Sequence, residues 1–219
     1  MDIPAPFKEI YPVRAGSMVD TFVDIAEQAF GDFLDEAAQG ESDSDKRRTS
    51  GIKTIVFAAM AIEAAAFEFS ASILGDKVAK DYLDKMDLEG KWMIGTRLAY
   101  GQSLDIDGLA INGLRSLVKA RNALVHHKSK LENEAGTVRE VIRTEWAKVE
   151  KDQVPNAFKT LVLLSLELEE SPGGFFGRFI YRDKSFCPPC FTNNKSSHPR
   201  VKKVIDRCRE IHTKNLKGA

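Results

Sequence analysis

The segment from Ile52 to Leu74 constrains the fold more than any other part of the chain. It is apolar on nearly every side of a helix, and only Lys53, Glu63 and Glu68 interrupt it. A helix that is apolar all round has to be buried, so this one predicts the centre of a helical bundle. Because charged residues interrupt it, the segment is a poor bilayer span, and we expect no association with a membrane.

Apolar residues recur at spacings of three and four along most of the remaining chain, which predicts an all-α fold. Residues 1–16 hold three prolines, which predicts an irregular N-terminal arm. Residues 17–170 are the predicted helical domain. The helix-breaking run of proline and glycine at 171–174 marks the start of a C-terminal extension over 171–219. Caps, glycines and prolines place the predicted helices at residues 17–38, 50–75, 77–86, 88–100, 106–128, 138–149, 155–170 and 199–214.

Charge is balanced over the whole chain and unevenly distributed along it. Residues 178–219 hold eleven basic and three acidic residues, a net charge of +8, which leaves the first 177 residues with 21 basic and 29 acidic, a net charge of −8. A basic extension on an acidic body can bind nucleic acid, or it can dock on that body, its own or a partner's. The sequence leaves both alternatives open.

The chain holds three cysteines, and its first twelve residues carry no apolar run of the kind found in signal peptides. Free thiols without an export signal are typical of a reducing cytoplasm, where we expect this protein. Cys187, Cys190, Cys208 and His212 have the residue types and spacing of four tetrahedral zinc ligands, since Cys208 and His212 lie one helical turn apart. A structural zinc site in the extension is therefore one hypothesis, and reduced cysteines without metal are the other.

A second feature is an arginine on an apolar stripe. Small or apolar residues recur with helical spacing, and Arg121 takes the next place in the series Ile106, Ala110, Leu114, Leu117, Arg121, Leu124. This spacing predicts that Arg121 faces the core, where a guanidinium needs a partner. Glu63 is the partner we expect, with Glu68 as the competitor; alternatively, Glu63 reaches solvent on a narrow polar face.

Arg121 belongs to the run Lys119-Ala-Arg-Asn-Ala-Leu-Val-His-His-Lys128. The run resembles the R-N-x-x-x-H motif of the HEPN superfamily, and the context between about Ser17 and Leu168 is similar. The resemblance implies a small all-helical bundle that forms a homodimer and cleaves single-stranded RNA without a metal cofactor, as a toxin or phage-defence effector. Other HEPN domains are non-catalytic modules that dimerise or bind RNA, a nucleotide or a partner protein.

The resemblance also implies roles for individual residues. His126 is the expected general acid or base, Arg121 stabilises the charge of the transition state, and Asn122 orients the histidine or contacts the phosphate. Glu63 is expected to support Arg121. His127 and Lys128 are expected to bind the RNA backbone, or to be ordinary exposed residues at a helix end.

Two points qualify how the motif works. Five helical positions turn through roughly 140° beyond one full circle, so Arg121 and His126 do not share a face of an ideal helix. Either the helix unwinds near Val125, or residues of two chains meet across a two-fold axis. In HEPN toxins a tyrosine often sits two residues after the histidine and is modified by the partner; here Lys128 occupies that position. We still expect a neutralising protein partner, but we do not expect control by modification of that tyrosine.

Overall fold

The structure is a computed structural model, and it describes residues 17–39, 45–126, 146–172, 180–181 and 197–218. Every regular element within these ranges is a helix, so the all-α prediction is confirmed. The elements are α1 (Val19–Ala38), α2 (Asp45–Leu74), α3 (Asp76–Val78), the π-helical turn Ala79–Leu83, α4 (Leu88–Tyr100), α5 (Leu109–Val125), the π-helical turn Val149–Gln153, α7 (Val154–Glu169) and α8 (Pro199–Gly218).

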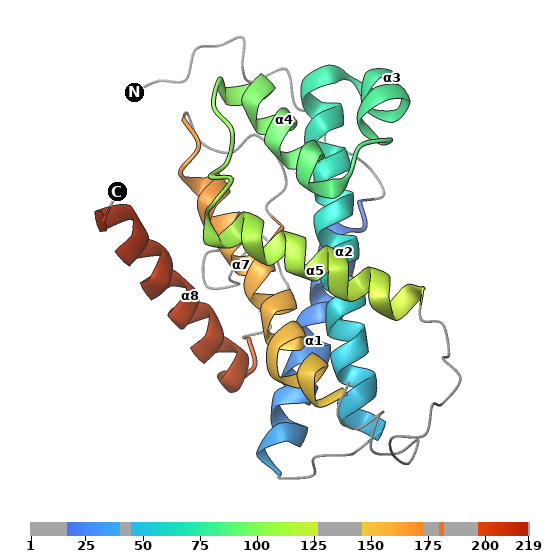
Figure 1. The fold of residues 1–219 in the computed structure, drawn as a ribbon, viewed down its shortest axis with the longest axis vertical. Coiled ribbons are helices and arrows are strands. Elements are labelled where there is room, and N and C mark those ends of the chain that lie inside the picture. Colours follow the sequence, from blue (N-terminus) through green and yellow to red (C-terminus); the bar gives the residue numbers. More distant parts are fainter. Residues whose placement is uncertain (1–16, 40–44, 127–145, 173–179, 182–196, 219) are drawn as a thin grey trace, which may run out of the picture.

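Three long helices, α1, α2 and α7, run along the long axis of the molecule, and α5 crosses over α2 and α7 (Figure 1). Helix α4 packs on the upper part of α2, and α8 lies along one edge against α7 and α1. Helix α2 contacts α1, α4, α5 and α7, so the most apolar segment is at the centre, as predicted. By length and composition alone α2 could cross a membrane, yet 61% of its most apolar window is buried inside the bundle.

Aromatic rings join the helices at the core. Phe30 of α1 stacks on Phe158 of α7, with ring centroids 4.6 Å apart, and Phe69 of α2 stacks on Trp92 of α4 at 5.6 Å. All four side chains are fully buried. Burial of a large apolar side chain contributes about 1.5–3 kcal/mol, so these contacts hold α1, α2, α4 and α7 in one body.

The position of α5 is set by close packing and by one ion pair. A Cβ atom added at Gly113 would lie 2.6 Å from Oγ1 of Thr160, and Nδ2 of Asn156 donates to the Gly113 carbonyl at 3.0 Å. The α5 backbone therefore touches α7 where a side chain would not fit. On the α4 side, Arg115 donates from Nε and Nη2 to the two carboxylate oxygens of Glu89, at 2.8 and 2.5 Å.

Several helix boundaries differ from the predictions. Helix α2 begins at Asp45 rather than at Ser50, because Arg47 pairs with Glu150 at 3.1 Å and lies over the ring of Phe33, which stabilises an additional helical turn. Ser50 is buried inside the helix, and its carbonyl accepts a hydrogen bond from Thr54.

Helix α5 is shorter than predicted at both ends, covering 109–125 rather than 106–128. At its start, the Gly108 amide donates to the Asp105 carbonyl at 3.1 Å, and this turn replaces the first predicted helical residues. Helix α8 starts at Pro199 as predicted and continues four residues past the predicted end, to Gly218. Most of the helix predicted over 138–149 lies outside the described residues.

Candidate functional site

The last turn of α5 projects beyond the helices that support it. The apolar stripe of α5 is buried through Leu114, Leu117 and Ala120, whereas Val125 is 56% exposed. In Figure 1 the C-terminal end of α5 passes across α2 and continues to the edge of the molecule. The prediction that Arg121 is buried is therefore wrong: its side chain is 35% exposed. The stripe does continue to Arg121, but by that point α5 has crossed α2 and projects beyond it.

Glu63 of α2 and Arg121 of α5 meet, as the sequence led us to expect. Nη2 of Arg121 lies 3.7 Å from Oε2 of Glu63, and the Glu63 side chain is half exposed. A pair this exposed is screened by water and contributes roughly 0–1 kcal/mol to stability. Its structural effect is to hold the guanidinium against α2 at the exposed end of α5.

Asn122 also contacts the guanidinium. Nη1 of Arg121 donates to Oδ1 of Asn122 at 3.0 Å. A guanidinium has five N–H donors in a fixed plane, and these two contacts leave others directed to solvent. An arginine that is held on two sides and partly exposed can bind a phosphate without first losing the freedom of its side chain.

His126 follows the last residue of α5. Its backbone angles, φ −104° and ψ 23°, depart from the helix, while its amide still donates to the Asn122 carbonyl at 2.9 Å. The helix thus ends at Val125, near the point where one of the two alternatives has it unwind. The exposed imidazole makes no hydrogen bond or ion pair with any other described residue, so the protomer holds Arg121 and Asn122 together but does not join His126 to them.

The two residues after the motif histidine, His127 and Lys128, lie outside the described residues, and their expected contact with the RNA backbone stays a prediction. An imidazole can donate or accept a proton in catalysis, and a guanidinium can stabilise negative charge on the oxygens of a phosphate. The chemistry of the described residues is therefore that of proton transfer and anion stabilisation at a solvent-facing helix end.

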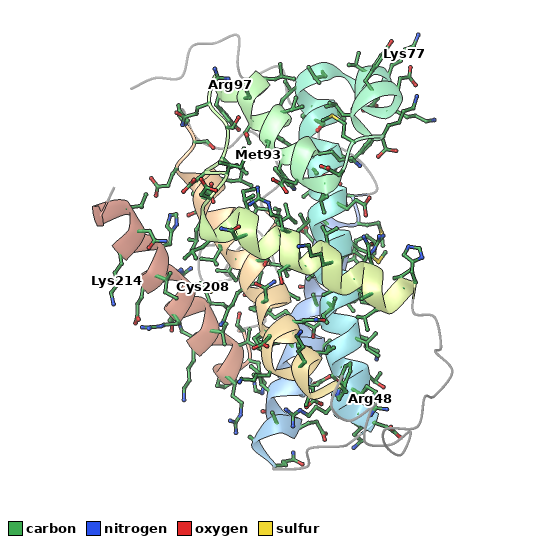
Figure 2. All side chains as sticks on the ribbon, viewed as in Figure 1. Arg48, Lys77, Met93, Arg97, Cys208 and Lys214 are labelled. Carbon is green, nitrogen blue, oxygen red and sulfur yellow. The ribbon has the colours of Figure 1, made fainter. Side chains whose placement is uncertain are left out.

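The predicted zinc ligands are only partly described. Cys187 and Cys190 lie outside the described residues. Cys208 is 1% exposed and points from α8 toward the bundle (Figure 2), and burial raises the pKa of its thiol to about 11. Nε2 of His212, one turn further along, lies 3.8 Å from Oε1 of Glu170. The described residues include no group of three ligands, so the zinc site stays a prediction, which elemental analysis of freshly purified, reduced protein would test.

The sequence did not indicate two features near α5. The first is the ion pair of Glu89 with Arg115, which fixes the start of α5. Hydrogen bonding to Glu89 raises the pKa of Arg115. The two residues are too far apart in sequence for helical spacing to predict that they pair. At the same end of α5, a cavity of about 180 Å³ is bounded by residues 102–105 and the end of α7. There burial raises the pKa of Glu167, whose Oε1 accepts from the Asp105 amide at 2.7 Å.

Comparison with known proteins adds no relative: no family model, no curated protein and no solved structure matches the chain.

Proposed function

We propose that this protein is a HEPN-type endoribonuclease that cleaves single-stranded RNA without a metal cofactor. The observation that carries the proposal is the placement of Arg121, Asn122 and His126 at the projecting end of α5, with the guanidinium held by Glu63 and the imidazole free of other described side chains. A phosphate can reach both groups from solvent at this end. A toxin or phage-defence effector, held in check by a neutralising protein, is the biological role that the motif resemblance favours.

The reaction that these groups support is transesterification within the RNA. The 2′-oxygen bonds to the adjacent phosphorus as its proton passes to an imidazole, and the bond from phosphorus to the 5′-oxygen breaks as that oxygen receives a proton. The products are a 2′,3′-cyclic phosphate and a 5′-hydroxyl. His126 moves the proton, which contributes about 10²–10⁴ to the rate, and Arg121 stabilises the charge on the phosphorus oxygens.

The active form is proposed to be a homodimer. The projecting turn leaves Val125 exposed and Leu124 half-buried, so an apolar stripe that is covered over most of α5 lacks a cover beside the motif. A two-fold axis along this turn would cover the stripe with its own copy and bring two histidines and two arginines into one cleft. One imidazole would then accept the proton and the other would donate one.

RNA cleavage in EDTA tests the proposal. Wild type, Arg121→Ala and His126→Ala are incubated with several unstructured RNAs, and the product ends are identified by mass spectrometry. We expect wild type to leave cyclic phosphates and each variant to lose at least about a hundredfold in rate. Arg97→Ala, which removes an exposed arginine from α4 (Figure 2), is the matched control and should retain full activity.

Circular dichroism and sedimentation show whether each variant keeps its fold and assembly. Activity that survives both motif substitutions would assign the cleavage to another site or to a contaminant, and the proposal would fail. A dimer of wild type that is well folded and cleaves none of the RNAs would also contradict it.

The alternative is a non-catalytic HEPN module that binds RNA, a nucleotide or a partner protein. One observation favours it: within the described residues of the protomer, no contact joins His126 to Arg121. Binding that depends on Arg121 but not on His126, without cleavage, is the result that this alternative predicts.

A further inference from the structure

We propose that α8 carries a binding site for the phosphodiester backbone of single-stranded RNA on the face that it turns away from the bundle. The choice of RNA as the partner rests on the proposed function; the site itself rests on how α8 docks. The basic extension would then do both things that the sequence left open: one side of α8 docks on the body, and the other side binds nucleic acid.

The docked face of α8 is defined by burial and by ion pairs at both ends. Val201, Ile205 and Cys208 are at most 1% exposed and belong to the main core. At the start of α8, His198 and Arg200 both lie 3.0 Å from the carboxylate of Asp35 on α1. At the other end, His212 lies near Glu170, just past α7. These contacts fix the rotation of α8 about its own axis.

This rotation leaves a line of exposed cations on α8, here named the basic row: Lys203, Arg207 and Lys214, with Arg200, which also pairs with Asp35 of α1, at its edge. At 100° per residue they fall within an arc of about 60°, and they extend over roughly 20 Å of helix. All four are exposed, and Figure 2 shows Lys214 on the side away from α7.

The charge of the basic row is only partly compensated. Over α8 as a whole, seven basic residues face two acidic ones, a net charge of +5. Arg207 pairs with Glu210 at 2.8 Å, and Arg200 shares Asp35 with His198. Lys203 and Lys214 have no carboxylate partner among the described residues. A line of cations with a net positive charge attracts a polyanion.

The composition of α8 favours RNA over a membrane surface. An interfacial helix has to insert a free apolar face into the lipid, whereas the apolar face of α8 is already covered by α1 and α7. The basic row contains no aromatic residue on which a base could stack. Binding should therefore be electrostatic, dependent on salt and indifferent to base sequence.

The basic row and the motif lie at opposite edges of the protomer in Figure 1. An RNA strand bound on α8 is therefore held at a distance from the phosphodiester bond that is cleaved. Such a contact is the same in the ground state and in the transition state, so its loss should raise KM and leave kcat unchanged.

The test measures binding of a fluorescent 20-nucleotide oligouridylate to the full chain in EDTA, as a function of salt. All variants carry His126→Ala, so that the probe stays intact. Lys203→Gln/Lys214→Gln leaves the ion pairs of Arg200 and Arg207 intact. We expect about ten- to a hundredfold weaker binding at low salt and a salt slope lower by about 1.4. The matched control Lys77→Gln/Lys80→Gln removes two exposed lysines, one in α3 and one in the π-helical turn that follows it, and should bind as the parent does.

The outcomes separate this proposal from the proposed function. Equal binding by the row variant and its parent would overturn the basic row, even if wild type cleaves RNA. Weaker binding by the row variant supports the basic row, even if wild type cleaves nothing. Binding of the parent to phosphatidylserine vesicles but not to oligouridylate would also overturn the proposal, since the partner would then be a membrane. In the active enzyme, a loss of kcat rather than a rise in KM would contradict binding away from the cut bond.

Discussion

The two halves of α5 carry one continuous pattern and have opposite surroundings. From Ala110 to Ala120 the helix is held by the core, by the Gly113 contact with α7 and by the Arg115 pair with α4. From Arg121 onward the same stripe is half exposed or exposed. The difference teaches that burial depends on where a helix passes beyond its neighbours, which periodicity in one helix does not record. It also shows how a solvent-facing motif can stand on a rigid support.

The largest effect should come from the embedded half. Leu114 is fully buried, so Leu114→Ala removes apolar contacts and leaves a cavity, and we expect a loss of about 3 kcal/mol in the free energy of unfolding. Val125→Ala makes a comparable truncation in the projecting turn and should cost less than about 0.5 kcal/mol in the monomer. Urea unfolding of both variants measures the contrast; equal losses would mean that the projecting turn is covered in solution.

The next effect concerns the contact between α5 and α7. Gly113→Ala places a methyl group 2.6 Å from Oγ1 of Thr160, so the helices have to separate or the threonine has to move. We expect a loss of about 1–3 kcal/mol, because overpacking a tight contact strains both elements. Ser116→Ala, at a position of α5 that is exposed, is the control and should be neutral or slightly stabilising. A stable Gly113→Ala protein would show that α5 does not depend on this close approach.

How much the sequence could predict depends on the range of the interactions. The all-α class, the central position of α2 and the pairing of Glu63 with Arg121 follow from helical periodicity and from the rule that charge on an apolar helix needs a partner. The exposure of Arg121 could not follow, since it depends on where α2 passes beneath α5.

The start of α2 shows the same limit. Ser50 is a good N-cap by residue type, but Arg47 finds Glu150 more than a hundred residues away and extends the helix to Asp45. For α8, the sequence showed an excess of basic residues but not which side of the helix would carry them into solvent. That side depends on which face of α8 packs against α1 and α7.

A smaller effect on stability is expected at the motif itself. Glu63→Gln keeps the size of the side chain but removes its charge, and the half-exposed pair with Arg121 contributes little, so the melting temperature should change by less than about 2 °C. If Glu63 positions the guanidinium, RNA cleavage should fall by about tenfold while folding is unaffected. Glu68→Gln, five residues along the same helix, has the same change of charge and serves as the control; equal loss of activity in both variants would exclude a specific positioning role.

The smallest effect should come from Glu167 of α7, which accepts a hydrogen bond from the turn before α5. Its pKa is raised, chiefly by burial, so folding favours the protonated carboxyl. The stability from this group is therefore fully present at pH values below the ordinary carboxyl pKa, and it is lost as the pH rises through the raised pKa of the folded state. Glu167→Gln stays neutral at every pH and can still accept from the Asp105 amide. We expect it to melt about 1–2 °C above wild type at pH 8 and together with wild type at pH 4.

Glu169→Gln, which changes an exposed carboxylate on the same helix, should melt with wild type at both pH values. A Glu167→Gln variant that melts below wild type at pH 8 would mean that the ionised carboxylate is the group that holds the Asp105 turn, and that the start of α5 is secured by charge rather than by burial.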